Sequence, residues 1–177
     1  MLITISGTPG TGKTGVAKIF AKKIGGKLIT TDYLARKYKI KATLDKNRKT
    51  KIIDAKKLSA AAKKESKNAM KAAIFEGHLS HFAPADVSIV LRASPAELER
   101  RLKKNGWSKK KINENIEAEA MGIISGEAKN SLEIDTTGKK PEQTAGLMIK
   151  ILNSRALKKR YSKKINWTGA YVKYLTR

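Results

Sequence analysis

The segment GTPGTGKT, residues 7–14, constrains the fold of this chain more than any other feature. It matches the pattern G-x-x-x-x-G-K-[ST] at every fixed position. A short apolar run, residues 2–6, precedes it, and apolar residues at helical spacing follow it over residues 16–24. A strand, a glycine-rich loop and a helix in this order form a cradle whose backbone N–H groups surround phosphate oxygens. We therefore expect the chain to bind a phosphorylated ligand here.

The pattern also predicts the role of each residue in the loop. Lys13 should reach the β- and γ-phosphates of a nucleotide, and replacing it with alanine should abolish turnover. The hydroxyl of Thr14 should ligate Mg²⁺. Backbone groups of Gly10, Gly12 and Gly15 should complete the cradle. The sequence thus predicts a nucleotide site with Mg²⁺ as the cofactor.

The rest of the chain alternates between short apolar runs and helical patterns. Four further strands are expected at residues 27–31, 73–75, 87–92 and 132–134. Parallel strands need helical crossovers, so the pattern predicts an α/β fold with a five-stranded parallel sheet and helices on both faces. A length of 177 residues fits a single domain, residues 1–177.

Local signals place several boundaries. Ser94, followed by proline and then by Glu97, indicates a capping-box helix start. Asp32 is expected to cap a short helix, and one helix is expected over residues 108–124. Residues 37–51 are basic and weakly patterned, and we expect them to be mobile.

Charge and composition restrict the possible partners. The chain has 39 lysine and arginine residues against 15 acidic ones, a net charge of +24. This balance favours nucleotides, RNA or an acidic protein surface over neutral partners, although a solvated lysine-rich surface would look the same. The absence of cysteine excludes disulfides and thiolate chemistry. The start MLITISG has no basic region, and no 18 apolar residues run together, so we expect a soluble cytoplasmic protein with no membrane partner.

Several classes of phosphate-binding protein do not fit. A GTPase needs an N-K-x-D base-reading motif, which the sequence lacks. Residues 135–138 match D-x-x-G, but they follow the last predicted strand, too late for a switch. Large motor ATPases need a longer chain. A small kinase-like fold remains.

Five segments together carry a resemblance to a known family: GTPGTGKT, LITTDYLAR, FEGH, VLRASPAELERRLKKNGWSKKKINENIEAE and EIDTTGKKPEQ. From about Leu2 to Leu152 the chain resembles the atypical adenylate kinases related to the coilin-interacting nuclear ATPase, with their archaeal relatives. The resemblance implies a P-loop nucleoside-monophosphate-kinase fold. Its short monophosphate-binding arm would be about residues 30–53 and its short lid about residues 104–114. A basic tail, about residues 155–177, follows.

The resemblance also implies an activity and partners. Members of that family resemble each other in phosphorylating nucleoside monophosphates, chiefly AMP, with ATP, and in hydrolysing ATP. They assist late maturation of the small ribosomal subunit and its 16S rRNA. The implied partners are small-subunit ribosomal protein eleven and pre-rRNA.

Two residues after the third predicted strand match the family's acidic-x-His element. Glu76 would hold Mg²⁺, usually through water, and take part in catalysis; otherwise it is a strand-end acid paired with a lysine. His78 would orient the attacking water or a phosphate, unless it is an ordinary loop histidine. His81 has no motif support, and we expect it to be structural.

Basic residues complete the implied site. Arg101 matches the family's helix arginine and would assist phosphoryl transfer. Thr30 and Arg36 would bind the monophosphate. Lys140 lies in the loop that lines adenine in the family. Arg36, like Arg92 at the end of the fourth predicted strand, could instead form a surface ion pair.

One residue departs from the family pattern. Asn105 stands where relatives carry a lid arginine, and asparagine supplies no charge. Lys103, Lys104 or Lys109 could substitute, but lysine lacks the bidentate fork of arginine.

Three functions therefore remain open. The first is a Mg²⁺-dependent kinase that phosphorylates AMP and also hydrolyses ATP. The second is an ATP-driven ribosome-assembly factor with little kinase activity. The third is a P-loop kinase of a small molecule such as a sugar acid.

Overall fold

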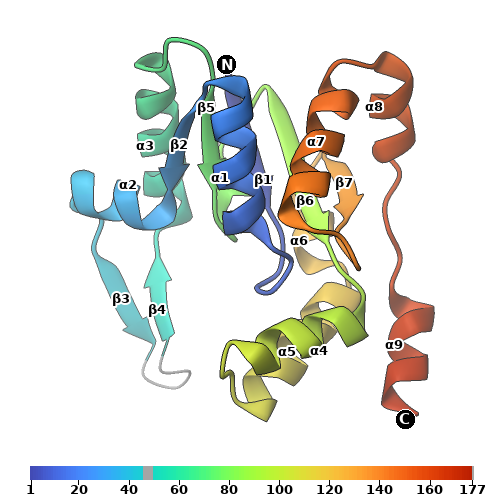
Figure 1. The fold of residues 1–177 in the computed structure, drawn as a ribbon. Helices are drawn as coiled ribbons and strands as arrows, with labels where there is room; N and C mark the ends of the chain where they lie inside the picture. The colour runs from blue at the N-terminus through green and yellow to red at the C-terminus, as the bar shows by residue number, and fades with distance from the viewer. Residues whose placement is uncertain (46–49, 177) are drawn as a thin grey trace.

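The computed structural model describes residues 1–45 and 50–176. Its central sheet is wholly parallel and has the strand order β2-β5-β1-β6-β7 (Figure 1). The strands are β1 (Leu2–Ser6), β2 (Lys27–Thr30), β5 (Ala73–Glu76), β6 (Val87–Arg92) and β7 (Leu132–Asp135). This arrangement confirms the predicted α/β fold with five parallel strands.

Helices connect the strands and extend beyond them. They are α1 (Lys13–Ile24), α2 (Thr31–Lys37), α3 (Ala55–Lys67), α4 (Pro95–Lys104), α5 (Lys109–Ala120), α6 (Ile123–Glu127), α7 (Pro141–Leu152), α8 (Arg155–Tyr161) and α9 (Thr168–Leu175), with a 3-10 turn η1 (Ser80–Phe82). In Figure 1, α1 and α7 lie together in front of the sheet, while α3 lies at its β2 side. Side chains of α1 and α7 pack on one face of the sheet and side chains of α3 on the other, so both faces are covered, as parallel sheets require.

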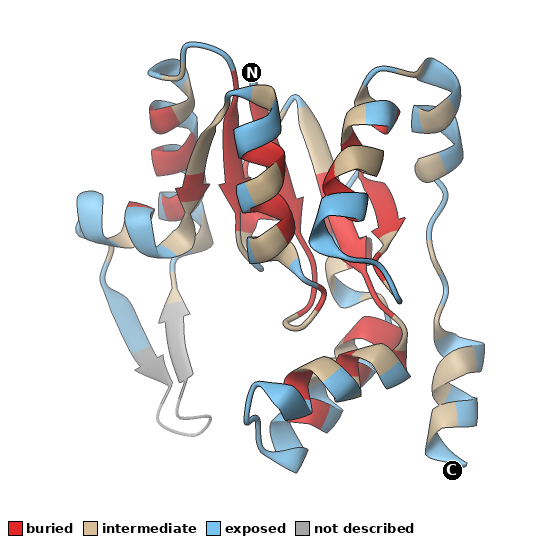
Figure 2. Ribbon diagram, in the orientation of Figure 1, coloured by how far each residue is buried: buried red, intermediate tan, exposed pale blue. Residues whose placement is uncertain are grey.

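Side chains of the strands alternate between two apolar clusters. Ile3 and Ile5 of β1 pack with α1 and α7, whereas Leu2 packs with Ile29, Phe75 and α3 on the other side. Figure 2 shows that the buried residues follow the strands and the helix faces turned toward them. The edge where these strands end carries the loop from β1 to α1, which positions the candidate site.

Two predicted helix boundaries are wrong. The short helix α2 is capped by Thr30, whose hydroxyl accepts the Tyr33 N–H at 3.1 Å, and not by Asp32, which lies in its first turn. A capping residue has an extended backbone, and Thr30 is still extended. Thr30 therefore caps the helix, and Asp32 already lies within its first turn. The helix expected over residues 108–124 is divided at Gly122, which adopts a left-handed conformation with φ of 66°.

The weakly patterned segment 37–51 contains an element that the sequence did not predict. Strands β3 (Ala42–Asp45) and β4 (Thr50–Ile53) pair antiparallel as a hairpin, apart from the central sheet. Ile53, at the end of β4, packs against the apolar cluster of α3, but two strands of four residues each are too short to give a clear alternating pattern. Residues 46–49 lie outside the described residues, and the expected mobility of the segment stays a prediction.

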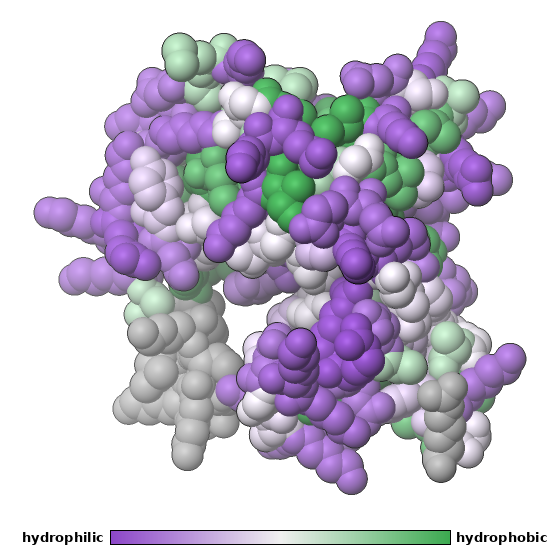
Figure 3. All heavy atoms as spheres, in the orientation of Figure 1, coloured by the Kyte–Doolittle hydropathy of each residue, from purple (hydrophilic) through white to green (hydrophobic). Residues whose placement is uncertain are grey.

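The basic tail folds back on the domain. Helix α8 packs against α7, with Leu157 and Tyr161 against the apolar cluster there. Helix α9 packs against α4 and α5 through Tyr171 and Tyr174. Charged and polar side chains dominate the face in Figure 3, apart from an apolar patch over α1 and α7. In the parts of the chain that the structure describes, no helix is long and apolar enough to cross a membrane.

Candidate active site

The loop from β1 to α1 wraps the start of α1 at the edge where the strands end (Figure 1). Gly10 has φ of 91°, and a Cβ atom there would lie only 3.0 Å from Leu98 and 3.1 Å from Leu102 of α4. Glycine at this position therefore permits both the turn and the close approach of α4. Helix α4 supplies the opposite wall of the site.

Lys13 opens helix α1 and points back over the loop. Its Nζ donates to the carbonyl of Thr8 at 3.1 Å. Burial lowers the pKa of the Lys13 ammonium to about 8, although the negative charges of Glu76 and Glu119 oppose this shift. Lys13 is still mostly protonated at neutral pH with this pKa, and an anionic ligand at the loop would raise the pKa again.

Thr14 and Glu76 lie together next to Lys13. The Thr14 hydroxyl is 3.3 Å and 3.4 Å from the two carboxylate oxygens of Glu76. Burial raises the pKa of the Glu76 carboxyl, while the Lys13 charge and the Thr14 hydroxyl hold it down. A hydroxyl beside a carboxylate is a set of hard oxygen donors, which suits Mg²⁺ completed by water and substrate phosphates. The residues present therefore fit the predicted metal.

The two histidines after β5 differ in their surroundings. His78 is exposed, and its pKa is lowered by partial burial of the ring and by the nearby Lys13 charge. The lowered pKa favours the neutral form of the imidazole. His81 has a side chain only 1% exposed, with Nε2 3.0 Å from a Glu127 carboxylate oxygen. This agrees with the structural role expected for His81.

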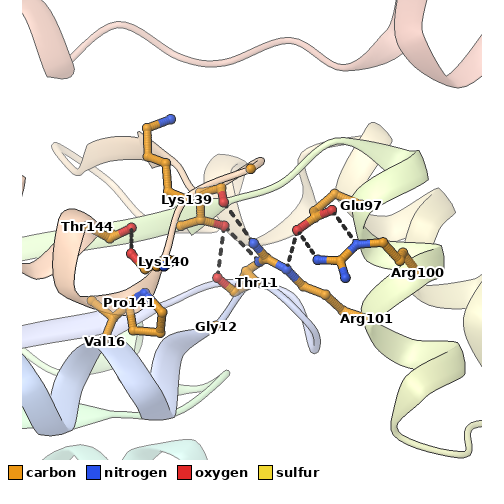
Figure 4. A pocket seen from close by; sticks show the side chains of 12 residues that line it. Thr11, Gly12, Val16, Glu97, Arg100, Arg101, Lys139, Lys140, Pro141 and Thr144 are labelled. Carbon is orange, nitrogen blue, oxygen red and sulfur yellow. Dashed lines mark hydrogen bonds and ion pairs between the residues drawn. The ribbon is translucent and has the colours of Figure 1, made fainter.

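Arg101 joins three parts of the site (Figure 4). Its Nε donates to Glu97 at 2.8 Å, Nη1 to the carbonyl of Gly10 at 3.1 Å, and Nη2 to the carbonyl of Thr136 at 2.8 Å. The guanidinium is thereby fixed between α4, the phosphate loop and the loop before α7. Its planar fork makes all three contacts at once, which a lysine cannot do.

Two adjoining cavities lie on either side of Arg101. One, of about 550 Å³, runs between Val16, Arg100 and the loop before α7, where Lys140 and Pro141 line it. The other, of about 410 Å³, lies over the phosphate loop and α4. Its lining includes Gly10, Gly12, Lys13, Thr14, Gly15, Arg100, Lys104 and Asn105. The predicted ATP-binding residues thus line two neighbouring cavities, which share Gly12, Arg100 and Arg101 in their walls.

The structure separates the three lysines that could replace the missing lid arginine. Lys104 lines the phosphate cavity beside Asn105. Lys103 instead pairs with Glu99 at 2.7 Å on the exposed face of α4, and Lys109 lines a different hollow, beside α9. Arg100, which the sequence reasoning missed, lines both nucleotide cavities. Arg100 and Lys104 therefore share the wall of one cavity with Asn105.

The predicted monophosphate residues lie on the other side of Glu76. Thr30 is the register partner of Glu76 in the β2–β5 pair, and Arg36 is exposed on α2. Helix α2 is tied to α3 through Glu65, whose carboxylate binds Lys37 at 2.6 Å and Tyr38 at 2.7 Å. The C-terminal end of α2 is therefore anchored to α3.

Arg92 is not the surface ion pair or site residue that the sequence suggested. Its side chain is 1% exposed and lies between Glu119 at 2.7 Å and Glu133 at 2.8 Å. Glu119 also accepts a hydrogen bond from the Thr8 hydroxyl. Thr8 and Glu119 are 111 residues apart, so no local spacing could have joined them.

Comparisons with known proteins give the family of the chain. A family described as AAA domain matches residues 3–122. The chain is 39% identical to the "Putative adenylate kinase" of Pyrococcus furiosus over 97% of this chain and 93% of that protein. It is 36% identical to the "Putative adenylate kinase" of Methanocaldococcus jannaschii, over 99% of this chain and 98% of that protein. The fold and site define a P-loop kinase. The chain belongs to the family of these archaeal adenylate-kinase relatives.

Solved structures support the fold alone, because their sequences are distant. Shikimate kinase from Aquifex aeolicus superposes with a TM-score of 0.60 at 14% identity, covering 89% of this chain and 99% of that one. Deoxyadenosine kinase from M. mycoides with bound dATP superposes with a TM-score of 0.55 at 18% identity, covering 87% of this chain and 100% of that one. The architecture is thus that of small P-loop kinases. The more specific relation to the coilin-interacting nuclear ATPase stays a prediction.

Proposed function

We propose that this protein transfers the γ-phosphoryl group of ATP to AMP, giving two ADP, and hydrolyses ATP when no acceptor is bound. One observation carries the proposal. Glu76 lies between Thr14 of the phosphate loop, 3.3 Å away, and Thr30 at the start of the arm, its register partner on β2. We take the phosphate-loop side of Glu76 as the donor side and the Thr30 side as the acceptor side, because phosphoryl transfer requires the two phosphates to be held next to each other.

Each predicted residue then has a task. An oxygen of the AMP phosphate forms a bond to the γ-phosphorus while the bond from that phosphorus to the ADP oxygen breaks. Lys13 and the loop backbone hold the phosphates, and Arg101 lies beside them with a fixed guanidinium. Neutral His78 orients the attacking oxygen. Thr14 and Glu76 would hold Mg²⁺, which supplies positive charge against the phosphate oxygens when bound.

The acceptor assignment follows from the relatives' names and from the arm. Thr30 and Arg36 are proposed to face the AMP phosphate, the arm of residues 30–53 to cover it, and the lid of residues 104–114 to exclude water. Lys140 and the loop before α7 are proposed to line the adenine of ATP. Asn105 leaves Lys104 and Arg100 to provide charge from the lid side.

The decisive experiment follows products with and without AMP. Two ADP formed for each ATP consumed, only when AMP is present, would support the kinase. Release of inorganic phosphate at the same rate without AMP would overturn it in favour of an ATPase. Lys13→Ala should abolish both reactions, and Asn105→Arg should accelerate transfer if lid charge limits it. Shikimate as an alternative acceptor tests the small-molecule kinase.

A second function has its own supporting observation. The net charge of +24 includes exposed basic residues on α8, namely Arg155, Lys158, Lys159 and Arg160. Such a surface suits ribonucleoprotein, with binding that weakens steeply as salt rises. We therefore propose small-subunit ribosomal protein eleven and pre-rRNA as cytoplasmic partners in 16S rRNA maturation. If the protein does not bind a 16S rRNA fragment, or binds it with an affinity that does not change with salt, this second function is ruled out.

A further inference from the structure

A cluster of buried charged side chains lies beneath the phosphate loop, outside the site described above. It is formed by Arg92, Glu119 and Glu133, all at most 2% exposed. Charged groups are rarely buried in this way unless they are paired, because each loses its hydration. The arrangement of the cluster is therefore tightly determined by its hydrogen bonds.

Glu119 connects this cluster to the phosphate loop. One of its carboxylate oxygens accepts the Thr8 hydroxyl at 2.5 Å. The other accepts Arg92 Nε at 2.7 Å and the Ala93 N–H at 3.1 Å. The side chain of Thr8, 3% exposed, is thus held from below by a group on α5.

Thr8 in turn holds Lys13 and Thr11 in place through its backbone carbonyl. Its carbonyl accepts Lys13 Nζ at 3.1 Å, the Thr11 hydroxyl at 2.8 Å and the Thr11 N–H at 3.2 Å. Rotation of the Thr8 backbone would therefore displace both the phosphate-binding lysine and the turn beside it. The Thr8 hydroxyl is the point at which α5 can prevent that rotation.

The cluster is closed on its far side by the segment between α8 and α9. Arg92 Nη1 donates to the carbonyl of Ile165 at 3.0 Å, and the Ile165 N–H donates to Glu133 at 2.8 Å. The Nζ atom of Lys164 lies 3.2 Å from a carboxylate oxygen of Glu133. The cluster therefore contains two cations, Arg92 and Lys164, and two carboxylates. Arg92 also donates to the Glu119 carbonyl at 2.9 Å, so Glu119 is fixed at both its side chain and its backbone.

We propose that Glu119 is a positioning residue of the nucleotide site, which fixes the phosphate loop through the Thr8 hydroxyl. It does not touch the nucleotide. It limits the loop to the conformation that binds phosphate, so its loss raises the dissociation constant for ATP and leaves the acceptor side unchanged. The inference rests on the proposed function only in taking ATP as the ligand.

The test measures Mg²⁺-ATP affinity by calorimetry, together with the KM values for ATP and AMP. Thr8→Val removes the hydroxyl but leaves every ion pair of the cluster, and it should weaken ATP binding roughly tenfold, as expected for a hydrogen bond to a charged group. Thr8→Ser, which keeps a hydroxyl, should bind nearly as well as the wild type. The KM for AMP should stay the same.

A double-mutant cycle then shows whether Glu119 acts through Thr8. Glu119→Gln should weaken ATP binding, and adding Thr8→Val should cause little further loss. Glu117→Gln, an exposed residue of the same helix, is the matched control and should bind like the wild type. Thermal stability is recorded for each variant, and Thr8→Val still decides the matter if Glu119→Gln does not fold.

The outcomes separate this proposal from the proposed function. A folded Thr8→Val protein with wild-type ATP affinity, or losses that simply multiply in the double mutant, would overturn the role of Glu119. A wild type that binds ATP but does not phosphorylate AMP would overturn the kinase and leave the affinity test intact. A tenfold loss restored by serine would support the proposal in either case.

Discussion

The Nη1 atom of Arg101 donates a hydrogen bond to the carbonyl oxygen of Gly10 at 3.1 Å. This contact joins helix α4 to the phosphate loop across the nucleotide hollow. Glu97 holds the same guanidinium from one turn earlier in the helix, at 2.8 Å. Arg101 is thus oriented before any ligand arrives, so that little of its side-chain freedom is lost on binding.

Replacing Arg101 by lysine should cost activity more than stability. Lysine keeps the charge but not the fork that reaches Gly10 and Thr136 together, and kcat should fall about 10²-fold, as for the loss of one preorganised donor. Steady-state kinetics at saturating substrates measure this. Lys103→Ala, on the exposed face of α4, is the control. Equal loss in both variants would contradict a specific role for Arg101.

Glu76→Gln should raise the Mg²⁺ concentration needed for half-maximal activity. The amide keeps the size of the side chain but removes the charge that faces Thr14 and Lys13. A magnesium titration at fixed ATP gives the value directly, with Glu117→Gln as the control. An unchanged magnesium requirement would assign Glu76 to strand-end structure alone.

Acid should weaken the anchor of the arm. Hydrogen bonds from Lys27 and Lys37 lower the pKa of Glu65 to about 2. Since the unfolded value is near 4.5, the stabilising effect is complete above about pH 5 and is lost as the pH falls toward 2. The difference in Tm between wild type and Glu65→Gln should therefore shrink between pH 7 and pH 3. Glu99 is half-buried and pairs with the exposed Lys103, so Glu99→Gln should make little difference at either pH. A gap that persists at pH 3 would argue against this linkage.

Gly77→Ala should disturb the loop that carries Glu76 and His78. Gly77 has φ of 153°, and an added Cβ would lie 2.3 Å from the Thr31 hydroxyl oxygen. The clash and the backbone conformation should together cost roughly 1–3 kcal/mol of folding stability and lower activity. Thr31→Ala removes the opposing atom, so the double variant should recover part of both losses in urea unfolding and turnover. No recovery would mean that backbone strain alone is responsible.

Local sequence was enough to predict the sheet and the glycine-rich loop between β1 and α1. The five strands, the glycine-rich loop and the helix start at Ser94 each depend on residues close together in the chain, and the structure confirms them. The capping box itself is only half formed: the Ser94 hydroxyl accepts the Glu97 N–H, but the Ser94 N–H donates to the Thr137 hydroxyl and not to Glu97. The predicted site residues around Lys13 and Arg101 border one hollow, although their roles await the experiments above.

What the sequence could not predict depends on distant pairing. The burial of Arg92 requires Glu119, Glu133 and Ile165 to meet from three separate segments. Similarly, the choice between Thr30 and Asp32 as a cap depends on where β2 ends, and not on their propensities. Propensity and spacing describe neighbours along the chain, whereas these contacts are set by tertiary packing.

The packing of α9 against α4 and α5 has a practical consequence for handling the protein. A fluorophore or affinity tag fused after Leu175 would lie beside the helices that flank the proposed lid, and would report on or obstruct their motion. Met1 precedes β1, at the sheet edge opposite the phosphate loop. Tags intended to be silent therefore belong at the first residue, and probes of lid movement at the last helix.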